Sequence, residues 1–174
     1  MTVRAVISYP SRILKTTAEP VGEIGPAERQ LAVDLVDTMR GSPGCVGVAA
    51  PQIAVPVRAF ALDISVMRRP HPNHGLIVLF DPELLHAEGS DVRREGCLSV
   101  PHYTCDVRRA TGVVVRGTTP DGDVRALETE GFEARAVQHE VDHLDGLLIL
   151  DRVASPRTDV FRRKRYARPG KRLT

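Results

Sequence analysis

Tryptophan is absent from this chain of 174 residues, and three tyrosines and four phenylalanines supply all of its Phe, Trp and Tyr content. No apolar run is long enough to span a bilayer, which excludes a transmembrane helix. The net charge of +2 gives no strong attraction to nucleic acid over the body of the protein. We therefore expect neither DNA nor a membrane as a partner.

Cysteine is also scarce, with three residues at irregular spacing, Cys45, Cys97 and Cys105. This spacing argues against a disulfide framework and favours a reducing compartment. The first ten residues contain one arginine and no continuous apolar core, so a secretory signal is not expected. Both observations predict a cytoplasmic location.

The chain length fits one domain, and the element pattern predicts an α+β fold with short antiparallel strands packed around a central helix. Helices are expected over about residues 26–40 and 131–145, where apolar residues recur at helical spacing. Strands are expected over residues 58–64 and 76–80. A hairpin is expected to join residues 112–117 to 124–127 through the turn at residues 120–122.

The segment that carries recognisable chemistry is the His-Glu-x-x-His pattern, which begins at His139 and ends at His143. On a helix this spacing places both imidazoles on one face, one turn apart. Two such rings can bind one metal ion while the adjacent Glu140 moves protons for a water molecule. The pattern predicts metal-dependent hydrolysis but does not identify the bond that is cut.

A helical wheel over this segment predicts two non-polar faces and one solvent-exposed strip. The first face carries Val137, Val141, Leu144 and Leu148, and the other carries Phe132, Ala136, His139 and His143. The strip between them carries Arg135, Gln138, Asp142 and Asp145. We expect core on one side of the helix, the site on the other and solvent along the strip.

A tetrahedral catalytic metal needs a third protein ligand. No histidine follows His143, so the residues leave Asp145, Asp151 and Cys97 as candidates. Taken alone, Cys97 is more typical of a small buried residue, in a strand or at a loop edge, than of a metal ligand. The other four histidines, at positions 71, 74, 86 and 102, are expected to be core or surface residues.

Three ordered segments together make the chain resemble the peptide deformylase family. Residues 45–52 are close to that family's Gly-x-Gly-x-Ala-Ala-x-Gln, residues 95–99 match its Glu-Gly-Cys-Leu-Ser, and residues 138–146 match its Gln-His-Glu-x-Asp-His-Leu-x-Gly. The resemblance extends to about residue 151. It implies hydrolysis of the formyl group from the N-terminal methionine of newly synthesised proteins, with release of formate.

The resemblance also implies roles for individual residues. The metal ligands would be Cys97, His139 and His143, and the physiological ion would be Fe²⁺, with zinc, nickel or cobalt as substitutes on isolation. Glu140 would carry the proton, and the Gln52 amide with the Leu98 N–H would stabilise the oxyanion. Val46 and Gly47 would lie along the substrate backbone. The wheel adds Phe132 and Ala136, with Val46 and Leu98, as the lining of the methionine pocket.

One position departs from the family pattern, because Cys45 stands where the first motif begins with glycine. Cysteine has a side chain and tolerates a positive φ poorly. The departure leaves two consequences open, an altered fit of the substrate or a redox-sensitive second thiol. The ligands and Gln52 are intact, so we expect activity.

Two other functions fit the helix motif alone. An endopeptidase would need a different third ligand and a long cleft. A structural metal module would need a fourth protein ligand, for which Cys105 and His102 are the nearby candidates.

We assign residues 1–160 to a single catalytic domain and residues 161–174 to a basic C-terminal tail. The tail contains seven basic residues: Arg162, Arg163, Lys164, Arg165, Arg168, Lys171 and Arg172. It is read either as a solvated terminus or as a weak electrostatic contact with ribosomal RNA, close to the nascent formyl-Met polypeptide.

Overall fold

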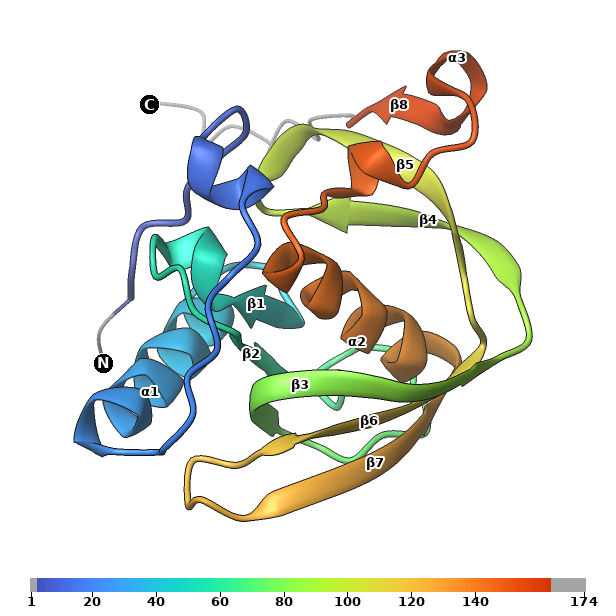
Figure 1. Ribbon diagram of the computed structural model, residues 1–174. Coiled ribbons are helices and arrows are strands. Elements are labelled where there is room, and N and C mark those ends of the chain that lie inside the picture. The colour runs from blue at the N-terminus through green and yellow to red at the C-terminus, as the bar shows by residue number, and fades with distance from the viewer. Residues whose placement is uncertain (1–2, 164–174) are drawn as a thin grey trace, which may run out of the picture.

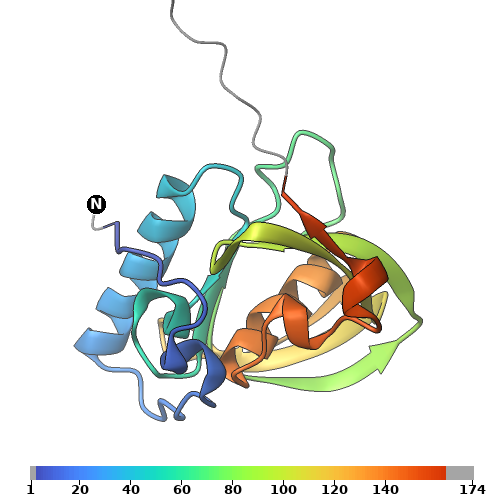
Figure 2. The ribbon, with the colours of Figure 1, turned by 90° about the horizontal axis from the view of Figure 1, so that it is seen from above.

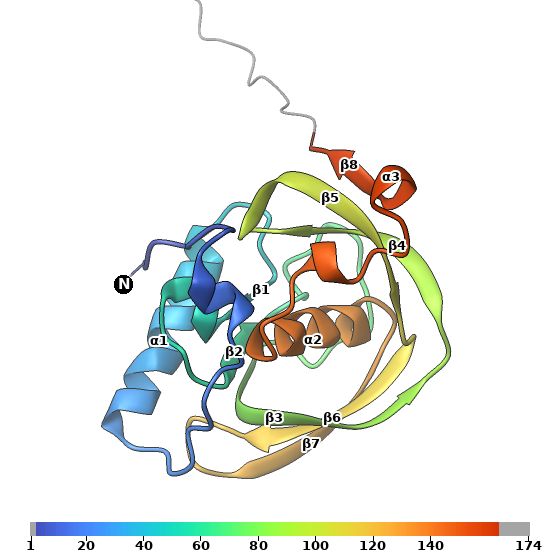
Figure 3. The same ribbon diagram turned by 45° about the horizontal axis from the view of Figure 1, so that its top comes forward.

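The computed structural model describes residues 3–163, and in them helix α2 (Gly131–Leu144) runs through the middle of the molecule with strands on several sides (Figures 1 and 3). This arrangement confirms the predicted α+β domain with a central helix. The other helical segments are η1 (Arg12–Lys15), α1 (Pro26–Gly41), η2 (Ala50–Ile53), η3 (Ile149–Asp151) and α3 (Pro156–Asp159).

Two antiparallel sheets surround α2. The five-stranded sheet has the order β1 (Gly47–Ala49), β2 (Ala59–Leu62), β3 (Ile77–Glu88), β6 (Gly112–Thr118) and β7 (Val124–Glu130). The three-stranded sheet has the order β4 (Asp91–Cys97), β5 (Val100–Arg109) and β8 (Val160–Arg162). The predicted hairpin is confirmed as the pair β6 and β7.

Two of the connections between the sheets lie side by side at one corner. There β3 continues into β4 and β5 continues into β6, and the Thr111 N–H donates to the Glu88 carbonyl at 2.9 Å. The two sheets cover different sides of α2 (Figure 2). This arrangement brings the end of β4 to the helix that carries the histidine pair.

Both predicted helices form, and each buries the face that its spacing indicates. Helix α1 begins at Pro26, where the Gly25 N–H donates to Glu28 Oε2 at 2.9 Å, and it packs Leu35 and Met39 against the region of β1 and β2. In α2, Val137 and Leu144 are completely buried in the core of the five-stranded sheet. Burial of each such side chain contributes about 1.5–3 kcal/mol.

The prediction of a solvent-exposed strip on α2 is wrong for two of its four residues. Arg135 is 4% exposed and Asp142 is 5% exposed. The three-stranded sheet lies over this side of the helix and supplies Glu95 and Arg109 as charged partners. Only Asp145 of the strip is exposed, and it pairs there with Arg58 at 2.8 Å.

The sequence patterns did not indicate most of the three-stranded sheet. Strands β4 and β5 alternate poorly, since their solvent face and part of their buried face are both charged. Strand β8 places Phe161 and Arg162 of the predicted tail in register with Thr104 and Tyr103 of β5. Residues 164–174 of that tail lie outside the described residues. None of the helices in residues 3–163 is long and apolar enough to cross a membrane.

Candidate metal centre and substrate cleft

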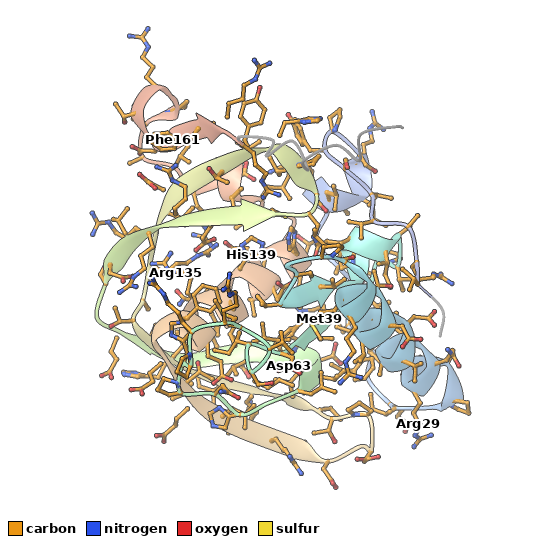
Figure 4. All side chains as sticks on the ribbon, turned by 180° about the vertical axis from the view of Figure 1, so that it is seen from behind. Arg29, Met39, Asp63, Arg135, His139 and Phe161 are labelled. Carbon is orange, nitrogen blue, oxygen red and sulfur yellow. The ribbon has the colours of Figure 1, made fainter. Side chains whose placement is uncertain are left out.

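The histidine pair of α2 has the geometry that its spacing predicts. The ring centroids of His139 and His143 lie 5.0 Å apart in an edge-to-face arrangement. His143 is 1% exposed, and Glu140 between them is 4% exposed. Both rings and the carboxylate therefore meet in a region that is largely closed to solvent (Figure 4 labels His139).

Cys97 reaches this pair from the end of β4. The pairing of β4 with β5 slips between Gly96 and Cys97, and the Cys97 Sγ lies 3.3 Å from the Nε2 of His143. Donor atoms of Cys97, His139 and His143 all lie within 4.8 Å of one another. One thiol and two imidazoles thus converge closely enough for a single ion to contact all three.

The other candidate ligands are engaged elsewhere. Asp145 pairs with Arg58, and Asp151 pairs with Lys15 at 2.6 Å. Within residues 3–163, no fourth histidine, cysteine or acidic residue joins the three-residue group. A closed structural site built with Cys105 or His102 is therefore not formed by the described part of the chain.

The surroundings of Cys97 favour a thiolate. Burial raises the pKa of this thiol, but the nearby His143 and His139 outweigh burial and hold its pKa well below the usual value. A thiolate with two imidazoles is a donor set that suits a borderline-soft divalent cation. The residues present therefore fit a metal ion.

Glu95 is a site residue that sequence reasoning did not identify. It is 7% exposed and accepts hydrogen bonds from the Nε and Nη2 of Arg109, both at 3.0 Å, and from the Nη1 of Arg135 at 2.7 Å. Its Oε2 also lies 3.0 Å from the Nδ1 of His139. This contact fixes the ring and leaves its Nε2 for the group with Cys97.

The charges around Glu95 form a buried network. Burial raises the pKa of this carboxyl, but hydrogen bonds from His139 and Arg109 outweigh burial and lower the pKa to about 2. Arg109 also pairs with Asp142, which in turn pairs with Arg152. Each buried charge is thus matched, which is the condition under which such groups are tolerated. A strand assignment would have given the signal, because Glu95 and Cys97 share one face of β4.

Glu140 lies directly against Gly47. A β-carbon at position 47 would overlap the Glu140 carboxylate, so only glycine leaves room for it. Burial raises the pKa of Glu140 to about 7. At neutral pH this group can therefore both accept and release a proton.

Gln52, on η2, is held with its amide nitrogen toward the thiol. It is 2% exposed, and its Oε1 accepts the Ala49 N–H at 3.0 Å. Its Nε2 lies 3.1 Å from Ser99 Oγ and 3.6 Å from Cys97 Sγ. A fixed donor therefore stands beside the group of possible ligands.

A cleft of about 690 Å³ opens over these residues. All five residues predicted to contact the substrate line it: Val46, Gly47, Leu98, Phe132 and Ala136. Phe132 stacks on His71 with 5.5 Å between ring centroids. The loop that carries His71 also contacts α2 through His74, whose Nδ1 lies 2.7 Å from Glu133 Oε2. The described residues place neither of these histidines among the possible ligands.

Cys45 lines the same cleft. Its Sγ donates to the Gly47 carbonyl at 3.1 Å. Burial, with the nearby Glu140 charge, raises the pKa of this thiol to about 12. Cys45 is therefore a protonated thiol at neutral pH, in contrast to Cys97.

Comparison with known proteins identifies the fold and the site together. The family model described as polypeptide deformylase matches residues 3–159. The chain belongs to the peptide deformylase family. A peptide deformylase from Desulforudis audaxviator is 44% identical over 165 residues, covering 94% of this chain and 99% of the relative. One from Thermodesulfovibrio yellowstonii is 37% identical over 164 residues, covering 94% and 97%.

Solved peptide deformylases share the architecture. The structure from Thermotoga maritima has a TM-score of 0.80 at 29% identity, covering 89% of this chain and 100% of that one. A class I type b enzyme from Acinetobacter baumannii, bound to Met-Ala-Ser, has a TM-score of 0.79 at 35% identity, covering 87% and 98%. This peptide deformylase is a metal-dependent hydrolase that removes the formyl group from the N-terminal methionine of newly synthesised proteins.

Proposed function

We propose that Cys97, His139 and His143 hold one divalent cation and that Fe²⁺ is the physiological ion. The convergence of a buried thiolate with two imidazoles is the observation that carries this proposal. When bound, such a cation supplies Lewis acidity to a carbonyl oxygen and lowers the pKa of water. Glu95 acts through His139, because its carboxylate orients the ring and increases the basicity of the ligand.

Glu140 carries the proton. It accepts a proton from the attacking water and delivers it to the amine that leaves when the formyl C–N bond breaks. Its burial beside both histidines and its pKa of about 7 support this role, since a general base works best near the operating pH.

The oxyanion that develops on the formyl group is stabilised by the Gln52 amide and the Leu98 N–H. Gln52 is preorganised, because Ala49 and Ser99 fix the two ends of its amide. Loss of one such donor typically reduces turnover by about 10²- to 10³-fold. The methionine side chain occupies the part of the cleft lined by Val46, Leu98, Phe132 and Ala136, with Gly47 along the substrate backbone.

Release of formate from formyl-Met-Ala-Ser tests the assignment. The wild type is expected to release formate, and Glu140→Gln and Glu140→Ala are expected to lose at least about 10²-fold in kcat while they retain metal. Cleavage of internal peptide bonds would favour an endopeptidase instead. Metal binding without turnover in the wild type would favour a structural module.

The metal is tested by loading the protein anaerobically with iron or with zinc. We expect the iron form to be more active and to lose activity in air, since ferrous iron bound by a thiolate is sensitive to oxygen. Equal and air-stable activity of the two forms would contradict the assignment of Fe²⁺.

We also propose a cytoplasmic enzyme whose C-terminal basic residues make weak contact with ribosomal RNA. The seven basic residues after residue 161 are the basis, and contact through phosphates would depend steeply on salt. Co-sedimentation with ribosomes should fall between about 50 and about 200 mM salt, the range over which binding through phosphates weakens. It should be lost when residues 164–174 are deleted. Unchanged co-sedimentation after deletion would refute the contact.

A further inference from the structure

The mouth of the cleft carries more positive charge than the reaction requires. Four arginines line it from four separate elements: Arg40 at the end of α1, Arg68 in the loop after β2, Arg94 in β4 and Arg163 after β8. All four are exposed. The acidic residues that line the same cleft, Asp63, Glu95 and Glu140, are all buried.

These buried acids do not neutralise the rim. Glu95 is matched by Arg109 and Arg135, and Asp63 accepts from the backbone and hydroxyl of Ser65. Within residues 3–163, no carboxylate lies within ion-pair distance of Arg40, Arg68 or Arg163, whereas Arg94 pairs with Asp106 at 2.6 Å. Three rim charges therefore have no acidic partner in the described part of the chain.

Arg163 has the most defined position of the three. Its backbone N–H donates to the His102 carbonyl at 2.8 Å, and this bond continues the pairing of β8 with β5. Beside it, Arg94 stacks over the Phe161 ring at 3.4 Å from the centroid (Figure 4 labels Phe161). The Arg163 guanidinium lies over Gly96, so close that a β-carbon at position 96 would overlap it.

Gly96 precedes the proposed ligand Cys97, so Arg163 lies beside the exit from the reacting centre. A peptide with its formyl group at Cys97 and its methionine beside Phe132 must leave through the mouth between these walls. Successive side chains of an extended peptide point to opposite sides. The first two residues after methionine would therefore face the arginines on one wall or the other.

We propose that this enzyme prefers substrates with an acidic residue at the first or the second position after formyl-methionine, and that Arg163 is a specificity-determining residue. The inference rests on the proposed function of the site. One exposed ion pair changes affinity by roughly 1.4- to 5-fold. Attraction of aspartate combined with repulsion of lysine by several arginines gives an expected difference of about tenfold in kcat/KM.

The experiment compares formate release from formyl-Met-Asp-Ala with that from formyl-Met-Lys-Ala, and from formyl-Met-Ala-Asp with that from formyl-Met-Ala-Lys. All peptides carry a C-terminal amide, because a free carboxylate would itself attract the arginines. At low salt, aspartate should be favoured about tenfold over lysine in at least one pair, and the ratio should shrink at high salt.

Variants of the full chain separate Arg163 from the overall charge. Arg163→Gln should bring the ratio toward one, and Arg163→Glu should favour lysine. Arg125→Glu is the matched control, because Arg125 is exposed on β7, does not line the cleft and undergoes the same change of charge. The control should keep the wild-type ratio.

Three results would overturn the preference: a wild-type ratio near one in both pairs at low salt, a preference for lysine, or equal effects of Arg163→Glu and Arg125→Glu. Absence of formate from every peptide, including formyl-Met-Ala-Ser, would contradict the proposed function itself. The two failures are therefore distinguishable.

Discussion

Replacement of Glu95 by glutamine should weaken both the fold and the metal site. The Glu95 side chain is 6% exposed and is held by two arginines and by His139. Glutamine preserves the size but removes the charge, and its amide nitrogen would face groups that are themselves donors. Removal of one partner from a buried ion pair destabilises by about 3–5 kcal/mol.

The lower end of that range applies here. Arg109 keeps Asp142 as a partner, and Arg135 keeps Asp91, so neither guanidinium is left entirely unpaired. We expect a loss of about 3 kcal/mol in the free energy of unfolding. In a domain of this size that corresponds to a fall of roughly 6–12 °C in Tm.

The assay is urea unfolding of metal-free protein, which isolates the network from the contribution of a bound ion. Glu83→Gln is the matched control, since Glu83 forms an exposed pair with Arg116 at 2.7 Å. The control should stay within about 0.5 kcal/mol of the wild type.

Metal affinity provides the second measurement. Competition with a chelator should show the Glu95→Gln protein binding metal about 10- to 100-fold more weakly, because the His139 ring loses the partner that orients it. If Glu95→Gln unfolds like Glu83→Gln and binds metal like the wild type, the network has neither role.

Three further predictions concern the cleft. Gly47→Ala should displace the Glu140 carboxylate and lower kcat on formyl-Met-Ala-Ser by about 10²-fold or more with metal content unchanged; wild-type turnover would show that the carboxylate has room to move. Alkylation of Cys45, followed by peptide mapping, should be roughly 30- to 60-fold slower at pH 8 than alkylation of an ordinary thiol. A pKa of about 12 leaves about 10³-fold less thiolate, and the greater nucleophilicity of that more basic thiolate offsets part of the loss. The labelling rate should rise about tenfold per pH unit as the thiol ionises, and labelling at the rate of a free cysteine would contradict the pKa. Phe132→Ala should raise KM for formyl-Met peptides about tenfold while metal is retained, since part of the methionine contact is lost; unchanged kinetics would remove Phe132 from the pocket.

Much of the site was predictable because it depends on local geometry. The spacing of His139 and His143 defines one face of a helix wherever that helix lies, and α2 forms over nearly the predicted residues. The resemblance then pointed to Cys97, which the structure brings within 3.3 Å of His143. The residues around Cys97 did not by themselves exclude a buried structural role.

The polar strip of α2 was misjudged for a different reason. In sequence, Arg135 and Asp142 have the spacing of a solvated face, and nothing near them indicates a cover. Their partners come from β4 and β5: Glu95 lies 40 positions before Arg135, and Arg109 lies 33 positions before Asp142. Whether a charge is buried depends on what packs over it, and that is a non-local property.

The sequence alone therefore determined the helix, the histidine pair and Glu140, because residues four apart on a helix meet without help from the rest of the fold. It also determined that a thiol was available for a metal. Only the tertiary structure decided that Cys97 meets the pair, that Glu95 orients His139, and that exposed arginines line the mouth of the cleft. Each of these depends on strands from distant parts of the chain, whose side chains become neighbours only when the two sheets close around α2.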